Sequence, residues 1–223
     1  LAFEHRPDAA WPFAFDCSQA FRLGEDTLEM SLSVTNQSWQ AAPFGLGWHP
    51  YFVKRPHSHL AFSATGRWEM GPDKLPTQRS ANAGLDVDCA ALDVDHCFEG
   101  CSGGVELHDP LLRIRLQSSL QRLVVFTQPV RDFVAIEPVS HVNNALNLVE
   151  RDPMLGLQEL GVEVLEPGQT LSASMRLVVG RDRNAVSASG RSTPSVSIPT
   201  DTRTHGCVCF LNQSSTSIRG SSI

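Results

Sequence analysis

Residues 45–52, with the sequence Gly-Leu-Gly-Trp-His-Pro-Tyr-Phe, place one histidine among aromatic residues. The two glycines permit backbone angles or close approaches that a Cβ atom would prevent. Pro50 fixes its own φ angle and favours an extended conformation at His49. We therefore expect a stiff turn or strand end that presents the His49 imidazole beside Trp48 and Tyr51. Such an aromatic wall suits a sugar ring, which has apolar C–H faces and hydroxyl edges.

A catalytic role for His49 requires a charged partner from elsewhere in the chain, because a single histidine in an apolar run is more often structural. Glu137 ends an apolar run and precedes Pro138. Desolvation at such a position raises the pKa of a carboxyl group and makes it a better base at neutral pH. An exposed glutamate at a strand end is the alternative. His141, four residues further on, is an additional candidate for the same pocket, although as a strand residue it could equally face away from it.

Asp95 is the third polar candidate, in the sequence Asp-His-Cys-Phe at residues 95–98. The segment places a carboxylate and a histidine beside an aromatic residue, which makes it a candidate site. The alternative is a solvated acidic loop.

The elements that must position these side chains have the period of two that is typical of strands. Gly, Pro, Asn and Asp separate many such short segments, and no stretch of useful length has a helical period. The sequence therefore predicts an all-β sandwich over residues 1–180. We expect its end, from residue 161 to residue 179, to form a hairpin around the turn Glu166–Gln169. The clearest alternating segments are Leu28–Asn36, Leu112–Gln117 and Thr170–Val179.

Residues 181–223 differ in composition, because they are rich in Ser, Thr and Arg and contain few apolar residues. We expect this tail to be disordered or unrelated to the sandwich. The chain begins at Leu1 instead of Met, without a basic and then apolar leader, so we expect a fragment or a processed chain with no signal peptide.

The composition excludes several classes of partner. The net charge is -6 and basic residues do not cluster, so neither nucleic acid nor a membrane is expected. The six cysteines are scattered, which favours reduced thiols and a cytoplasmic location. Cys97, Cys101 and His108 lack a second pair of ligands nearby, so no metal is expected.

Five segments, taken together and in order, resemble the aldose 1-epimerase (galactose mutarotase) family. The octet is similar to its G-x-H-x-Y-F motif, and residues 134–147 to the segment that carries its glutamate. The remaining three segments are Leu75–Thr77, Asp95–Phe98 and Leu165–Gln169.

The resemblance implies a large antiparallel β-sandwich, often called a supersandwich, and interconversion of the α and β anomers of a free aldose. It implies that Glu137 takes the proton of the anomeric hydroxyl and that His49 protonates the ring oxygen. No metal, nucleotide or other cofactor takes part, and a small-molecule sugar is the expected partner. The candidate sugar contacts are Asp95, Trp48, Tyr51 and His141.

The family usually also has an upstream segment with an Asn-Arg pair and another histidine, which this sequence does not match. Two alternatives to the aldose 1-epimerase therefore stay open. One is an epimerase of hexose 6-phosphates, for which Arg113, Arg115 and Arg131 are the candidate phosphate ligands. The other is a catalytically silent carbohydrate-binding sandwich. The sequence does not determine the oligomeric state.

Overall fold

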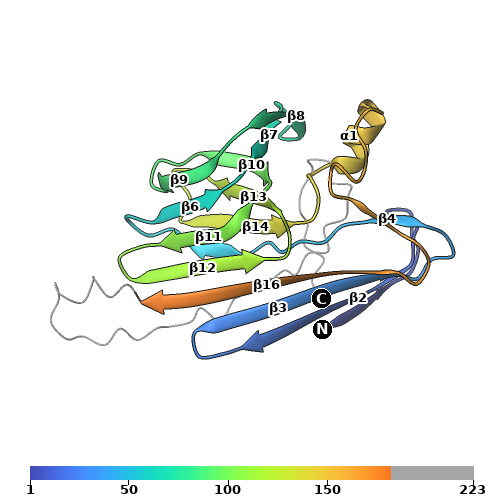
Figure 1. Ribbon diagram of the computed structural model, residues 1–223, viewed down its shortest axis with the longest axis horizontal. Helices are drawn as coiled ribbons and strands as arrows, with labels where there is room; N and C mark the ends of the chain where they lie inside the picture. The colour runs from blue at the N-terminus through green and yellow to red at the C-terminus, as the bar shows by residue number, and fades with distance from the viewer. Residues whose placement is uncertain (182–223) are drawn as a thin grey trace.

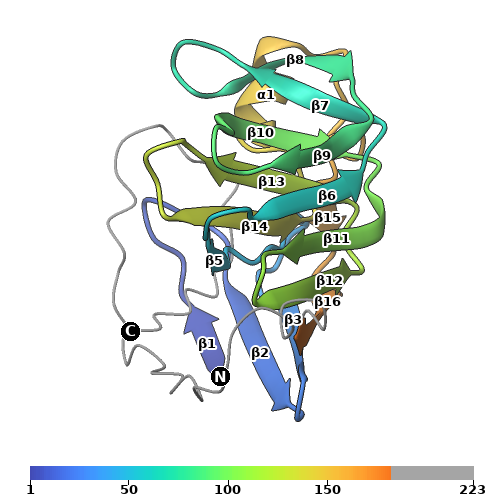
Figure 2. The ribbon, with the colours of Figure 1, turned by 90° about the vertical axis from the view of Figure 1, so that its left-hand side faces the viewer.

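The computed structural model describes residues 1–181, which form two large antiparallel β-sheets and one short helix (Figures 1 and 2). The two sheets pack against each other, and the ring of Phe62 in one meets the ring of Phe98 in the other at 5.0 Å. The predicted tail at 181–223 lies outside the described residues, except for Arg181. The prediction of an all-β sandwich is confirmed.

The spatial order of the strands is β1-β2-β3-β16-β12-β11-β6-β9 in the larger sheet and β5-β14-β13-β10-β7-β8 in the smaller sheet. The larger sheet contains β1 (Ala2–His5), β2 (Phe15–Leu23), β3 (Thr27–Asn36), β16 (Thr170–Arg181), β12 (Leu112–Ser118), β11 (Ser102–His108), β6 (His59–Ser63) and β9 (Gly84–Asp88). The smaller sheet contains β5 (Tyr51–Val53), β14 (Phe133–Val139), β13 (Arg122–Thr127), β10 (Val94–Glu99), β7 (Gly66–Met70) and β8 (Pro76–Ala81). A separate pair joins β4 (Ala42–Phe44) to β15 (Glu163–Leu165), and the helix α1 spans Ala145–Arg151.

Strand β14 differs from the amphipathic strands because six of its seven residues, Val134–Val139, are buried on both sides. One side faces the larger sheet. On the other side, Arg122 donates hydrogen bonds to the carbonyl oxygens of Ser140 and Glu159, which ties the segment containing α1 to the neighbouring strand β13. The strand that carries Glu137 is therefore enclosed, and it can hold its side chains rigidly.

Two expectations about local structure are wrong. The end of the sandwich is not a hairpin, because β15 pairs with β4 whereas β16 pairs with β3 and β12. The turn Glu166–Gln169 thus joins two different sheets. The helix α1 was not expected because its seven residues complete only two turns, too few to show a helical period.

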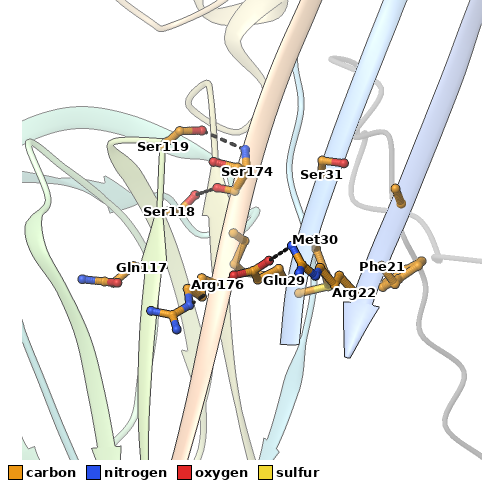
Figure 3. A pocket seen from close by; sticks show the side chains of 12 residues that line it. Phe21, Arg22, Glu29, Met30, Ser31, Gln117, Ser118, Ser119, Ser174 and Arg176 are labelled. Carbon is orange, nitrogen blue, oxygen red and sulfur yellow. Dashed lines mark hydrogen bonds and ion pairs between the residues drawn. The ribbon is translucent and has the colours of Figure 1, made fainter. Parts of the chain in front are cut away.

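The smaller sheet leaves part of the larger sheet's inner face uncovered. Phe21 lies in one cross-strand row with the buried Met30 and Met175, yet Phe21 is 42% exposed and Leu23 is 82% exposed. A hollow of about 650 Å³ opens at this row, over β2, β3, β16 and β12 (Figure 3). Ion pairs of Glu29 with neighbouring arginines border the hollow. None of the predicted site residues lines it.

Candidate active site

The histidine segment runs antiparallel along β14 and continues the smaller sheet beyond β5. Tyr51 is the cross-strand partner of Ala135 in the β5–β14 ladder. Gly47 is the partner of Val139 in an isolated bridge with the same register. This register places residue 49 directly opposite residue 137. Pairing between two segments about 90 residues apart in sequence thus brings the two main candidates together.

His49 and Glu137 occupy the kind of cross-strand position at which side chains lie closest. The backbone N–H of Trp48 donates to the carbonyl oxygen of Pro138 at 3.1 Å, so these two residues form a hydrogen-bonded pair. The adjacent pair, His49 and Glu137, is then a non-hydrogen-bonded pair, in which the α-carbons are about 4.5 Å apart. The His49 Nε2 lies 3.1 Å from the Glu137 Oε1.

The side chains of this pair are largely shielded from solvent. The side chains of His49 and Glu137 are 23% and 10% exposed, so both stay accessible to a ligand while much of their solvation is lost. The ring of Tyr51 stacks on the ring of His49, with centroids 4.6 Å apart and planes 30° apart. Burial raises the pKa of Tyr51, and the nearby charge of Glu137 raises it further.

The glycines of the octet are needed for close packing against β14. A Cβ atom on Gly45 would lie 2.1 Å from the Nδ1 of His141, and one on Gly47 would lie 2.9 Å from the Cγ1 of Val139. Both glycines face the side on which the Glu137 and His141 side chains project, because these positions alternate along the same strand face. The missing side chains therefore let the histidine segment lie flat against β14.

His141 has a buried position instead of one that opens to a ligand, which corrects its expected role as a sugar contact. The residue is 4% exposed. The backbone N–H of Leu46 donates to the Ser140 Oγ at 2.9 Å, and this hydroxyl lies 3.0 Å from the His141 Nδ1. Burial lowers the pKa of His141 to about 4, and the charge of Arg122 contributes in the same direction. His141 therefore supports the histidine segment as a neutral ring.

The low pKa of His141 predicts that the protein loses stability on acidification. Between pH 6.5 and about 4 the unfolded chain binds a proton at this residue and the folded chain does not. The free energy of unfolding should therefore fall by up to about 3 kcal/mol as the pH drops through this window. Urea denaturation from pH 4.5 to 7.5 measures the effect. His141→Gln should flatten the dependence, whereas His57→Gln, at an exposed position, should not; equal slopes in all three proteins would contradict the assignment.

Trp48 does not face the proposed pocket, and the expectation that it packs on a sugar is corrected. Trp48 is 3% exposed and belongs to the hydrophobic core, whereas Tyr51 is 57% exposed. The reason is the period of two: His49 and Tyr51 share one strand face, and Trp48 lies on the other. The sequence identified the aromatic cluster but not the side on which each ring lies.

Asp95 lies on the same face of the smaller sheet as Glu137. Asp95 belongs to the cross-strand row Asp95–Phe126–Ala135–Tyr51. Glu137 belongs to the next row on the same face, two residues further along β14. Strand spacing and rise place the α-carbons of Asp95 and Glu137 roughly 12 Å apart on this face. Burial raises the pKa of Asp95, while Lys74 opposes this shift.

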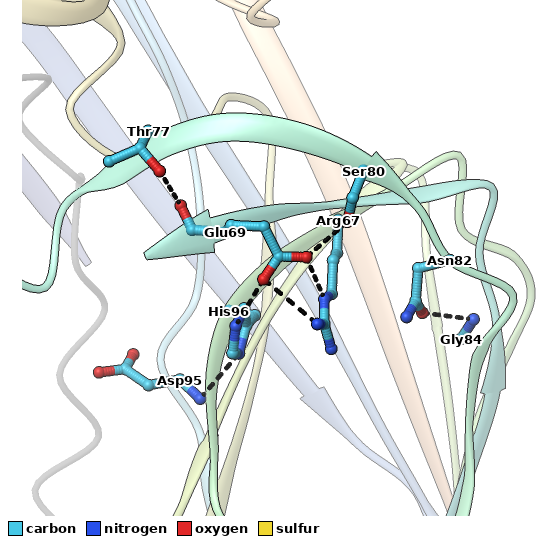
Figure 4. A network of polar contacts seen from close by, with 8 residues as sticks. All are labelled: Arg67, Glu69, Thr77, Ser80, Asn82, Gly84, Asp95 and His96. Atoms are coloured by element: carbon cyan, nitrogen blue, oxygen red, sulfur yellow. Dashed lines mark hydrogen bonds and ion pairs between the residues drawn. The ribbon is translucent and has the colours of Figure 1, made fainter. Parts of the chain in front are cut away.

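His96 projects to the opposite face and belongs to a separate polar network. Its Nε2 lies 3.5 Å from the Glu69 carboxylate, which also accepts hydrogen bonds from Arg67 and Ser80 (Figure 4). Figure 4 shows the Asp95 carboxylate pointing away from this network. The hydrogen bonds from Arg67 and Ser80 lower the pKa of Glu69. The network braces β7, β8 and β10, and Asp95 is left on the Glu137 side.

Within residues 1–181, no group of three or more His, Cys, Asp or Glu side chains is arranged to hold a metal ion. The four cysteines of this part are free thiols. Burial raises the pKa of Cys97 to about 12 and that of Cys101 to about 11. The only helix described, α1, is far too short to cross a membrane.

A sequence model of a protein family, described as aldose 1-epimerase, matches residues 1–177 of the chain. The chain belongs to the aldose 1-epimerase family. The resemblance found in the sequence motifs is therefore confirmed.

A relative from Escherichia coli K12, described as "Uncharacterized protein YphB", is 46% identical over 202 residues. The aligned part covers 80% of this chain and 64% of that protein. The chain thus spans less than two thirds of the length of this relative.

Solved structures agree with the family fold. The crystal structure of a "Putative aldose 1-epimerase" from Escherichia coli K12 aligns with a TM-score of 0.69 and 26% identity, over 81% of this chain and 64% of that chain. A galactose mutarotase-like protein from Clostridium acetobutylicum aligns with a TM-score of 0.70 and 19% identity, over 81% and 62% of the two chains. The second likeness shows the galactose mutarotase-like sandwich fold alone.

The sequence interpretation missed Phe133 and Ser140, which contact Tyr51 and His141 respectively. Phe133, Ala135 and Glu137 follow one another at intervals of two residues, so the sequence places all three on one face of the strand. That signal identifies a face but not the neighbour across the sheet. Ser140 had no distinguishing signal, because its hydrogen bond to the histidine segment depends on long-range pairing.

Proposed function

We propose that this protein is an aldose 1-epimerase that interconverts the α and β anomers of free hexoses, with Glu137 as the base and His49 as the acid. The observation that carries the proposal is the 3.1 Å contact between the His49 Nε2 and the Glu137 Oε1, where the histidine segment runs along the buried strand β14. The reaction requires one proton acceptor and one donor near a single carbon, and the anomeric carbon bears both the hydroxyl and the ring oxygen.

In the reactive state Glu137 is ionised and His49 is protonated. Glu137 takes the proton from the anomeric hydroxyl, and His49 gives its proton to the ring oxygen as the bond from C1 to that oxygen breaks. The open-chain aldehyde rotates about its C1–C2 bond. Closure on the other face of the carbonyl reverses both transfers and restores the two groups. Because the two side chains touch each other, the sugar must bind with both oxygens facing the same side of the pocket.

Asp95 is the proposed acceptor of hydrogen bonds from sugar hydroxyls. Its carboxylate projects from the Glu137 face about two strands away, so it can hold the far side of a ring whose anomeric centre lies at His49.

Polarimetry of freshly dissolved α-glucose and α-galactose tests the proposal. The 223-residue chain should accelerate the change in optical rotation over buffer, and heat-denatured protein should not. A rate equal to that of buffer, with sugar binding intact by calorimetry, would favour a silent carbohydrate-binding sandwich and reject the enzyme.

An epimerase of hexose 6-phosphates is the second candidate, and one observation favours it. The Arg131 guanidinium lies 5.9 Å from the centre of the Phe133 ring, which in turn contacts Tyr51. Arg113 and Arg115 both pair with Glu106 on the larger sheet, which argues against a role as phosphate ligands beside Glu137. Faster mutarotation of glucose 6-phosphate than of glucose, lost in Arg131→Gln, would support this candidate.

A further inference from the structure

Tyr51 makes its closest ring contact with His49, two residues earlier on the same strand face. The centroids are 4.6 Å apart and the planes are inclined by 30°, so one face of the phenol ring covers the imidazole. A ring face that is covered by another side chain is not free to pack on a sugar. Tyr51 therefore has a geometry that suits contact with the histidine better than contact with a ligand.

Tyr51 is itself held from the opposite side. Its ring meets Phe133 edge to face, at 5.1 Å and 81°. Phe133 also contacts Phe126 at 6.1 Å and lies under the guanidinium of Arg131. The cross-strand partner of Tyr51 is Ala135, whose small side chain leaves space for the diagonal contact with Phe133. The result is a row of packed rings that ends at His49.

We propose that Tyr51, anchored by Phe133, is a positioning residue that holds the His49 ring in line with Glu137. This inference rests on the proposed function, since it assigns His49 the role of proton donor. A ring stacked on an imidazole restricts its rotation, and the electron-rich face of the phenol favours the protonated form. Restricting the donor matters because a displacement of about 1 Å can cost up to a hundredfold in rate.

The test compares Tyr51→Leu with Tyr51→Phe in the full 223-residue chain. Tyr51→Leu removes the aromatic face and should lower kcat for α-glucose mutarotation about tenfold, with KM within about twofold of the original value. Tyr51→Phe keeps the ring and should retain kcat within about twofold. Val53→Ala is the matched control, because Val53 lies on the same strand and face at 58% exposure; it should change neither constant.

Three kinetic results would overturn the proposal. A rise in KM with unchanged kcat in Tyr51→Leu would make Tyr51 a platform for the sugar. An equal loss in Tyr51→Phe would assign the effect to the hydroxyl group. No effect of Tyr51→Leu would mean that the stack does not matter for catalysis.

Nuclear magnetic resonance separates this inference from the proposed function. The His49 ring protons should show nuclear Overhauser contacts to the Tyr51 ring, and their resonances should shift downfield and broaden in Tyr51→Leu. If the unaltered chain does not accelerate mutarotation, the proposed function fails while this measurement still decides the position of the ring. Absence of the ring contacts, or identical His49 resonances in both proteins, would reject the positioning role.

Discussion

Glu137→Gln is expected to lower the catalysed rate of mutarotation by at least about a hundredfold, towards the rate in buffer. The amide has the shape of the carboxylate but cannot accept the proton of the anomeric hydroxyl. It also removes the charge that the protonated His49 faces at 3.1 Å. Polarimetry with α-glucose measures the rate, and circular dichroism with thermal unfolding shows whether the sandwich is retained.

The control for this substitution is Glu163→Gln, at an exposed position of β15. It makes the same chemical change outside the site and should retain the full rate. His49→Gln should reproduce the loss seen in Glu137→Gln. If the double variant is no slower than either single variant, the two residues act as a unit. Full activity of Glu137→Gln would show that the base lies elsewhere.

Gly45→Ala is expected to reduce both stability and activity, although it adds only one methyl group. The new Cβ atom would lie 2.1 Å from the His141 Nδ1, and the buried ring of His141 has little space to move. Overpacking of this kind costs about 1–3 kcal/mol. Displacement of the segment that carries His49 should also lower the rate of mutarotation about tenfold or more. Urea denaturation and polarimetry measure the two effects.

Two further variants separate a local clash from a general effect of alanine. Gly180→Ala should be neutral, because the nearest atom to its Cβ, the Arg113 carbonyl oxygen, lies 4.0 Å away. In a background of His141→Ala the clash disappears, so Gly45→Ala should then cost little additional stability. A cost that is the same with and without the His141 ring would show that the glycine is required for another reason.

Alternation of apolar and polar residues was enough to predict most strands and the sandwich. The period of two decides which residues share a face, and segments such as Leu28–Asn36 carry it over many residues. It was not enough for the connection after residue 161. The turn Glu166–Gln169 is a strong local signal, but local chemistry does not determine which strands pair on either side. The short α1 was missed because its length gives no period.

The sequence by itself identified the candidate groups: one histidine between glycines and aromatic rings, one glutamate before a proline, and one aspartate in a motif that resembles the family's Asp-His-x-Phe segment. Only the tertiary structure decided which of these meet. The register between β5 and β14 places His49 beside Glu137, turns Trp48 into the core and buries His141 against Gly45. The physical reason is that a one-residue change in register would move every side chain to the other face, and this register depends on contacts between distant segments.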